Sequence, residues 1–270
     1  MSKSDVSYFV FDVESVADGN LVSRLRYPDE NLDPITAVRR YRDELMEQHN
    51  SDFIPYTFQI PISVAIAKIS AEYQLLDLVV LDEPEFRPHV ITENFWRGWQ
   101  AYRQPAFVTF NGRGFDVPLL ELAAFRYGLN LANWFQPNAK SFDQLRNRYN
   151  QRGHIDLCEL MTNFGSTRFT GGLNLAANLL GKPGKMDVQG DMVQDMFDQG
   201  RVKEINDYCR CDVLDTYFVF LRSRVMLGLL SLEDEQAQIA ETKTWLEQRI
   251  DQTPAYRDYL ENWGDWVNPW

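Results

Sequence analysis

Two acidic side chains interrupt an apolar stretch near the N-terminus. Asp12 and Glu14 lie within FVFDVES, residues 9–15, among phenylalanines and valines. Residues two apart on a strand project from the same face, so these side chains would be about 6–7 Å apart along the strand. Because two like charges this close repel each other, a compensating group is needed. A bound divalent cation is one good candidate, and it would support metal-assisted chemistry.

A third acidic residue, Asp116, follows a glycine-rich turn in FNGRGFDVPLL, residues 110–120. The turn joins an expected strand, 106–111, to an expected helix, 117–128. Ligands of open α/β sheets gather at this edge. An acid at a helix start also has a purely structural interpretation, as a cap that complements the helix dipole. Taken alone, Asp116 favours that structural interpretation.

Tyr208 and Asp212 lie four residues apart in DYCRCDVLDTY. On a helix this spacing places them on one face, although such a pair can equally lie on a solvated face. If the fold brings Asp212 together with Asp12, Glu14 and Asp116, the four carboxylates form an oxygen-rich site. Such a site suits Mg²⁺ or Mn²⁺ rather than zinc. Two ions about 4 Å apart are a recurring device for displacement at phosphorus.

The elements that must position these residues follow from the pattern of the chain. We expect strands at 7–14, 61–70, 74–82, 106–111 and 154–160, and helices at 35–48, 92–104, 117–128, 173–181, 190–199, 201–228 and 232–250. Ala71 and Glu72 would form a hairpin turn, and Thr92 would cap its helix. This order predicts an α/β fold with a mixed sheet.

Composition narrows the class of protein. The 270 residues carry 27 basic and 39 acidic side chains, a net charge of −12, and 44% are hydrophobic. The acidic balance argues against a general DNA-coating protein but not against an enzyme that grips one nucleic-acid end. No apolar run reaches about 18 residues and no signal peptide is evident, so we expect a soluble, cytoplasmic protein with no membrane partner.

The cysteines Cys158, Cys209 and Cys211 are few and odd in number, which fits a reducing compartment better than a disulfide scaffold. The close spacing of Cys209 and Cys211 raises the question of a zinc site with both thiols as ligands. On a helix they would lie about 200° apart and would not readily hold one ion together. Small buried thiols are the alternative.

Three motifs, in this order, resemble those of the DEDD superfamily of 3′–5′ exonucleases, in its tyrosine subtype. FDVES is similar to the first motif, FNGRGFDVPLL to the second motif of family B DNA polymerase proofreading domains, and YCRCD to the third, Tyr-x-x-x-Asp. HIDL, 154–157, is similar to a strand between the last two. The resemblance covers about 5–222, and no polymerase body follows. It therefore indicates a free-standing predicted exonuclease of RNase H-like fold.

The resemblance implies a role for each motif residue. Asp12, Glu14, Asp116 and Asp212 would hold two Mg²⁺ or Mn²⁺ ions, one activating the attacking water and the other stabilising the leaving 3′-oxygen. Tyr208 would orient that water, because a reference pKa near 10 makes a phenol a poor base near neutral pH. The products would be nucleoside 5′-monophosphates.

The same resemblance implies substrate contacts. Asn111 and Phe115 would contact the terminal nucleotide, Phe115 by packing on its base or sugar. Lys185, in KPGKMD, is a candidate phosphate contact, with a solvated loop as the alternative. The basic segment 140–152 would grip a strand or form a solvated face. The likeness to family B favours a single-stranded DNA 3′ end over RNA.

The expected domain organisation is an exonuclease domain at 1–228, with an insertion at 19–55, and an acidic, Trp-containing extension at 229–270. The extension would dock on the body or bind a protein partner. His154 and Asp156 are expected to be structural. A non-catalytic module of the same fold, binding a nucleic-acid end or a protein, is the alternative function. An unrelated α/β protein with coincidental motifs is a third interpretation.

Overall fold

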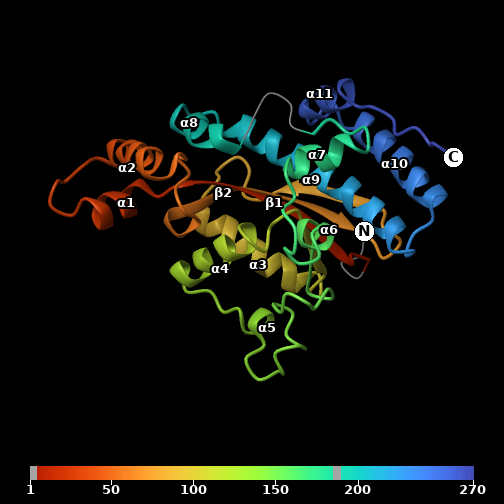
Figure 1. The fold of residues 1–270 in the computed structure, drawn as a ribbon, viewed down its shortest axis with the longest axis horizontal. Helices are drawn as coiled ribbons and strands as arrows, with labels where there is room; N and C mark the ends of the chain where they lie inside the picture. The colour runs from red at the N-terminus through yellow and green to blue at the C-terminus, as the bar shows by residue number, and fades with distance from the viewer. Residues whose placement is uncertain (1–4, 185–189) are drawn as a thin grey trace.

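The computed structural model describes residues 5–184 and 190–270. Within these residues the chain forms a five-stranded mixed sheet in the order β3-β2-β1-β4-β5, with helices on both faces (Figure 1). The strands are β1 (Tyr8–Ala17), β2 (Gln59–Ile69), β3 (Leu75–Val80), β4 (Ala106–Thr109) and β5 (His154–Asp156). The α/β architecture and the RNase H-like fold expected from the sequence are confirmed.

The central strand β1 explains the apolar run that Asp12 and Glu14 interrupt. It pairs antiparallel with β2 and parallel with β4 along its two edges, and helices cover both of its faces. The odd-numbered side chains of Phe9, Phe11 and Val13 enter the core on one face, whereas Val10 enters the core on the other. Strand alternation therefore directs Asp12 and Glu14 to the same side as Val10.

The face that receives Phe9 and Phe11 is covered by α3 (Pro88–Ala101) and α4 (Asp116–Tyr127). Its core is rich in aromatic rings, including the fully buried Trp99 and Trp134. Trp134 belongs to the short helix α5 (Ala132–Phe135), which precedes an irregular segment. This layer places the N-terminus of α4, and with it Asp116, at the end of β4.

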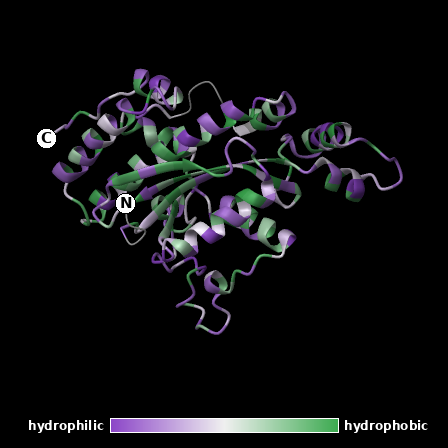
Figure 2. Cartoon of the chain, turned by 180° about the vertical axis from the view of Figure 1, so that it is seen from behind, coloured by the Kyte–Doolittle hydropathy of each residue, from purple (hydrophilic) through white to green (hydrophobic). Residues whose placement is uncertain are grey.

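The opposite face is covered by α9 (Val202–Met226), whose side chains are buried along most of its length. Three short helices, α6 (Leu157–Met161), α7 (Gly172–Asn178) and α8 (Val193–Asp198), and the 3₁₀ turn η2 (Gly190–Met192) lie beside it. Figure 2 shows the sheet mainly in the colours of hydrophobic residues between these two helical layers. The face of β1 that carries Asp12 and Glu14 is therefore the face that α9 covers.

The insertion at 19–55 folds into two helices, α1 (Gly19–Arg26) and α2 (Pro34–His49), which project beyond the sheet (Figure 1). Asp18 and Asp33 cap the two helices. A small core of its own, which includes Val22, Tyr41 and Ile54, holds the insertion together. The 3₁₀ turn η1 (Tyr56–Phe58) leads from it into β2.

The C-terminal residues form α10 (Leu232–Glu247) and α11 (Ala255–Glu261), which pack on α9. The buried Tyr259 hydroxyl donates a 2.6 Å hydrogen bond to Asp215 of α9. Lys182 Nζ donates to the carbonyl of Gly264 and lies 4.0 Å from the centre of the Trp263 ring. The extension therefore docks on the body, one of its two expected destinations.

Several element boundaries differ from the expectation. Thr92 is not a helix cap, because α3 begins at Pro88 and the Thr92 hydroxyl instead donates to the Pro88 carbonyl. The expected strand 154–160 is only three residues long and turns into α6, which Asp156 caps. The hairpin between β2 and β3 is confirmed. None of the described helices is long and apolar enough to cross a membrane.

Candidate active site

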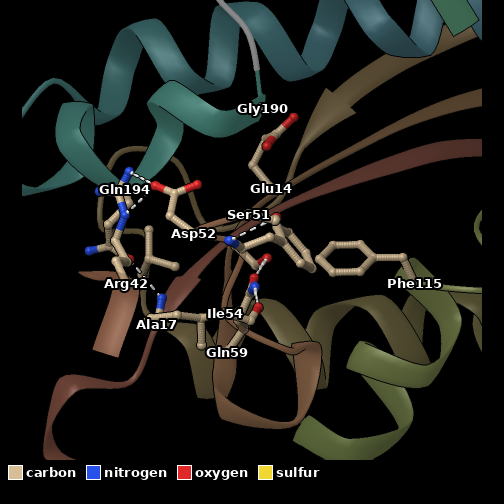
Figure 3. Close-up of a pocket in the computed structure, with 13 residues that line it drawn as sticks. Glu14, Ala17, Arg42, Ser51, Asp52, Ile54, Gln59, Phe115, Gly190 and Gln194 are labelled. Carbon is tan, nitrogen blue, oxygen red and sulfur yellow. Dashed lines mark hydrogen bonds and ion pairs between the residues drawn. The ribbon is translucent and has the colours of Figure 1, made fainter. Parts of the chain in front are cut away.

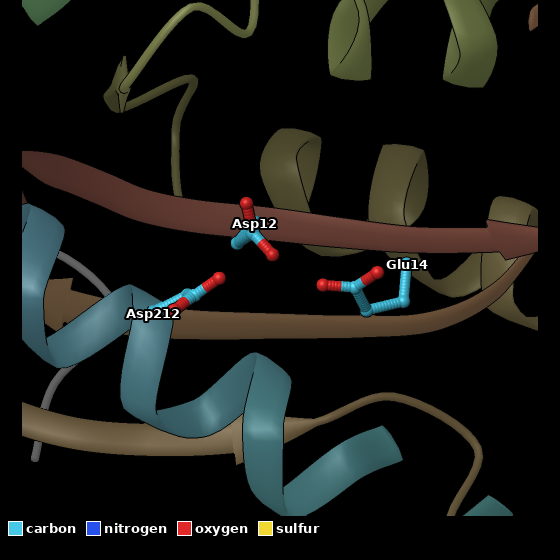
Figure 4. Close-up of side chains that lie close together, drawn as sticks. All are labelled: Asp12, Glu14 and Asp212. Carbon is cyan, nitrogen blue, oxygen red and sulfur yellow. The ribbon is translucent and has the colours of Figure 1, made fainter. Parts of the chain in front are cut away.

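Three carboxylates from distant parts of the chain converge between β1 and α9. One oxygen from each of Asp12, Glu14 and Asp212 lies within 4.8 Å of the others. Figure 4 shows Asp12 and Glu14 coming from the strand and Asp212 from the helix that faces it. We call these three side chains the carboxylate cluster. In the described residues, it is the one group of His, Cys, Asp and Glu ligands arranged closely enough to hold a metal ion.

Cys209 holds α9 against β1 at this point. It lies three residues before Asp212, is fully buried, and its Sγ is 3.5 Å from the Asp12 carbonyl oxygen. A small buried thiol at this position lets the helix backbone approach the strand closely. The cysteine therefore has a packing role, and Cys209 and Cys211 do not form a shared metal site in the described structure.

Asp116 lies beside the cluster and contacts the strand backbone. It is buried as the first residue of α4, and its Oδ1 accepts a 3.0 Å hydrogen bond from the backbone N–H of Val13. The β4 pairing partners of β1 end at Val10, so no β4 residue pairs with Val13. The Asp116 carboxylate therefore satisfies a strand amide that lies between Asp12 and Glu14. It does not cap α4, whose preceding residue is Phe115.

The negative charges in this region repel one another. Burial, followed by the negative charge of Asp116, raises the pKa of Asp12 to about 7. Burial also raises the pKa of Asp116 to about 7, with further increases from Asp156 and Asp212. Burial and the neighbouring carboxylates raise the pKa of Glu14 well above its usual range. A cation would relieve this repulsion, and an all-oxygen donor set fits Mg²⁺ or Mn²⁺.

Tyr208 lies one helical turn before Asp212 and faces the cluster. Burial raises the pKa of its phenol far above the usual range, and the charges of Asp212, Glu14 and Asp12 add to that increase. The phenol therefore remains protonated at any ordinary pH. It can donate a hydrogen bond or orient a bound water, but it is not a base near neutrality.

A groove of about 750 Å³ opens on one side of the cluster. We call it the Asn111 groove; its lining includes Asp12, Asn111, Thr167, Arg168, Asn174 and Asp212. The Arg168 side chain is exposed there and forms no ion pair within the described residues. The sequence interpretation missed Arg168, because a single arginine in a polar loop belongs to none of the three motifs.

A second hollow, of about 530 Å³, opens on the other side of the cluster (Figure 3). We call it the Phe115 pocket; its lining includes Glu14, Arg42, Phe53, Gln59, Phe115 and Gln194. Glu14 and Phe115 point into it from different elements (Figure 3). The insertion supplies Arg42 and Phe53, whose part in this pocket was not expected from the sequence.

Asp156 organises the turn that carries Asn111 and Phe115. Its carboxylate accepts hydrogen bonds from the backbone N–H groups of Asn111 and Arg113, at 3.0 and 2.9 Å, and also caps α6. The ring of His154 lies 2.8 Å from the Thr109 hydroxyl through Nε2. The two residues begin and end β5, and both are hydrogen-bonded in place, as expected for structural side chains.

Two further substrate contacts were expected, Lys185 and the basic segment 140–152. Lys185 lies outside the described residues. In the basic segment 140–152, Arg146 pairs with Glu121 and Arg148 pairs with Glu159, so part of its charge is neutralised by the body. That segment lines neither the Asn111 groove nor the Phe115 pocket.

Comparison with known proteins gives one result that bears on this site. A protein-family model described as a predicted 3′–5′ exonuclease related to the exonuclease domain of PolB matches residues 51–263. The matched range contains Asp116, Tyr208 and Asp212 together with α10 and α11, and it begins after the strand that carries Asp12 and Glu14. A search of curated proteins found no match.

Proposed function

This chain belongs to the family of predicted 3′–5′ exonucleases related to the exonuclease domain of PolB, and from that membership we propose that it is a metal-dependent enzyme that removes nucleotides from the 3′ end of a nucleic acid. The observation that carries the proposal is the convergence of Asp12, Glu14 and Asp212 within 4.8 Å. Asp116, bonded to the strand between the first two, adds the fourth carboxylate.

Each residue has a defined part in this proposal. Asp12, Glu14, Asp116 and Asp212 would hold the ions, and Asp116 also fixes the strand through its hydrogen bond from Val13. Two Mg²⁺ or Mn²⁺ ions, when bound, would lower the pKa of the attacking water and stabilise the charge that develops at phosphorus. Tyr208 donates a hydrogen bond that orients the water, since its raised pKa keeps the phenol protonated. The products are nucleoside 5′-monophosphates.

The substrate we propose is a single-stranded 3′ end, DNA more than RNA, lying across the carboxylate cluster. Asn111 and the cation of Arg168, which has no ion pair within residues 5–184 and 190–270, would contact the strand in the Asn111 groove. A positive charge there offsets the repulsion between phosphates and an acidic protein. Phe115 would contact the terminal nucleotide from the opposite pocket. The phosphate contact by Lys185 remains a prediction.

We also propose that residues 1–228 form the catalytic domain and that 229–270 stabilise it from outside. The hydrogen bond from Tyr259 to Asp215 supports this, because Asp215 lies on the helix that carries Asp212. A cytoplasmic location agrees with three cysteines that form no disulfide. A protein partner of the extension remains a hypothesis.

A non-catalytic module of the same fold is the second candidate function. Such a module would bind a nucleic-acid end without cleaving it. The retention of all four carboxylates and of Tyr208 favours the enzyme, because burying mutually repelling carboxylates destabilises a fold that has no use for a cation.

The test is the degradation of a 5′-labelled single-stranded DNA oligonucleotide, with Mg²⁺ or Mn²⁺ and with EDTA. A matched RNA and an Asp12→Ala variant accompany it. We expect a metal-dependent ladder that shortens from the 3′ end and is absent in the variant. If neither substrate is cleaved while the wild-type protein still binds the oligonucleotide, the non-catalytic module is the better description.

A further inference from the structure

The insertion at 19–55 places an exposed aromatic ring beside the cluster. Phe53 lies four residues after the end of α2 and is 58% exposed, although the next residue, Ile54, is buried in the core of the insertion. The ring centroids of Phe53 and Phe115 are 5.8 Å apart with an interplanar angle of 53°. The two rings therefore form one continuous aromatic wall of the Phe115 pocket, half of it supplied by the insertion.

The polar side chains that line this pocket are largely engaged with the protein. Arg42 pairs with Asp52 and Asp195, and the amide of Gln59 is hydrogen-bonded to the Ile54 carbonyl and to Ser15. Among the lining residues that the structure describes, these side chains leave no unpaired cation for a phosphate and few groups to read the edge of a base. The pocket thus offers aromatic surface, which suits any base through stacking rather than through sequence recognition.

Two contacts cross the pocket on the side of Arg42 and Gln194. Arg42 Nη1 of α2 lies 2.7 Å from Asp195 Oδ1 of α8, which links the insertion to the opposite wall. Gln194 Oε1 of α8 accepts a 2.8 Å hydrogen bond from the backbone N–H of Ala17 at the end of β1. A strand that enters from the Asn111 groove and crosses the cluster would meet these linked walls in the pocket. Its volume, about 530 Å³, suits a single small ligand.

We propose that Phe53 is a specificity-determining residue, and that with Phe115 it packs against the base of the unpaired 3′-terminal nucleotide while the linked insertion stops the strand there. The proposal rests on the exonuclease function proposed above. The insertion then has a defined role. It limits the enzyme to 3′ ends whose last base is free to enter the pocket, without preferring one base over another.

The first experiment compares wild-type protein with Phe53→Ala and Phe53→Trp under single-turnover conditions. One oligonucleotide ends in a normal nucleotide and a second ends in a nucleotide that lacks its base. Base–aromatic stacking energies correspond to an increase of about 5- to 150-fold in the half-saturating concentration of the normal substrate for Phe53→Ala. Phe53→Trp should have the same half-saturating concentration as wild type. The baseless substrate should be cleaved equally by wild type and Phe53→Ala. Phe125→Ala, which removes an exposed ring that lines neither hollow, serves as the control.

A second measurement does not depend on cleavage. An oligonucleotide with 2-aminopurine at its 3′ end and a nonhydrolysable last linkage is bound to each protein. Stacking on the aromatic wall quenches its fluorescence in wild type and Phe125→Ala but not in Phe53→Ala. Quenching without cleavage of the normal oligonucleotide would refute the proposed function and leave this inference standing. Equal weakening of normal and baseless substrates, or unchanged quenching in Phe53→Ala, would overturn the inference.

Discussion

The carboxylate of Asp116 accepts a 3.0 Å hydrogen bond from the backbone N–H of Val13, the residue that separates Asp12 from Glu14. This bond joins the second motif to the first across 103 positions of sequence. It fixes the strand from which two cluster carboxylates project, and it brings a further negative charge against them. Asp116 thus positions the strand and also adds to the charge of the site.

Replacing Asp116 should separate these two effects. Asp116→Asn keeps an oxygen acceptor for Val13 but removes the charge, so we expect the metal-free protein to gain about 1–3 kcal/mol in free energy of unfolding at pH 8. Activity should fall at least about 100-fold. Asp116→Ala leaves the buried Val13 N–H without a partner and should be about 1–3 kcal/mol less stable than the Asn variant. Urea unfolding in EDTA measures the stability of both variants. Equal stability of the two would contradict the role of the hydrogen bond.

Replacing Asp212 should abolish metal binding at the cluster. Asp212→Asn removes one of three converging charges, and we expect Mn²⁺ affinity and cleavage rate each to fall by at least about 100-fold. Isothermal titration with Mn²⁺ and the oligonucleotide assay measure the two effects. Glu204→Gln, an exposed acid of the same helix, is the matched control and should behave as wild type. Undiminished Mn²⁺ binding in Asp212→Asn would show that the cluster is not the metal site.

Tyr208→Phe should slow cleavage without changing its dependence on pH. The phenol is protonated throughout the usual assay range because burial and neighbouring carboxylates raise its pKa. Loss of a water-orienting hydrogen bond should lower kcat about 10- to 100-fold and leave the shape of the pH–rate profile between pH 6 and 9 unchanged. If the variant instead lost an ascending limb of that profile, Tyr208 would be acting as a base.

Metal binding should stabilise the protein more at alkaline than at acidic pH. The pKa values of Asp12 and Asp116 are raised to about 7 in the metal-free fold, so between about pH 4 and 7 the folded state holds more protons than the unfolded state. The contribution of this pair to stability is therefore lost as pH rises through 7. Divalent ions compete with those protons for the same oxygens.

Thermal unfolding with EDTA or Mn²⁺, at pH 5.5 and pH 8, measures this effect. We expect the increase in Tm on adding Mn²⁺ to be larger at pH 8 and to be lost in Asp212→Asn. At 100 times Kd the ion should contribute about 2.7 kcal/mol. An equal increase in Tm at both pH values would mean that Mn²⁺ binds away from the protonated carboxylates.

Tyr259→Phe should destabilise the protein while sparing its chemistry. The change removes the donor to a buried carboxylate, Asp215, whose pKa burial raises to about 8. We expect a loss of about 1–3 kcal/mol in free energy of unfolding, with kcat unchanged for the folded enzyme. Above pH 8, where Asp215 becomes ionised, the double variant Tyr259→Phe/Asp215→Asn should recover part of the stability, since no buried charge is then left without its partner. A large fall in kcat at full folding would instead indicate that the extension positions α9.

The sequence by itself determined the features that depend on local backbone geometry. Strand alternation placed Asp12 and Glu14 on one face, and the helical repeat placed Tyr208 beside Asp212. The same local rules located the β2–β3 hairpin and the end of α4 at Gly128, whose φ of 72° favours glycine. Because these rules act over a few residues, they can be read from any segment in isolation.

Only the tertiary structure decided which distant groups meet. The backbone N–H of Val13 is free to donate a hydrogen bond to Asp116 because β4 ends before it could pair with Val13. No local sequence pattern predicts where β4 ends. Phe53 reaches Phe115 because the insertion folds on its own core, and Arg168 reaches the groove from a polar loop. Docking of α10 and α11 on α9 likewise depends on buried contacts such as Tyr259 with Asp215. Such contacts join residues tens to more than a hundred positions apart, so they follow from the packing of whole layers and not from the spacing of residues along the chain.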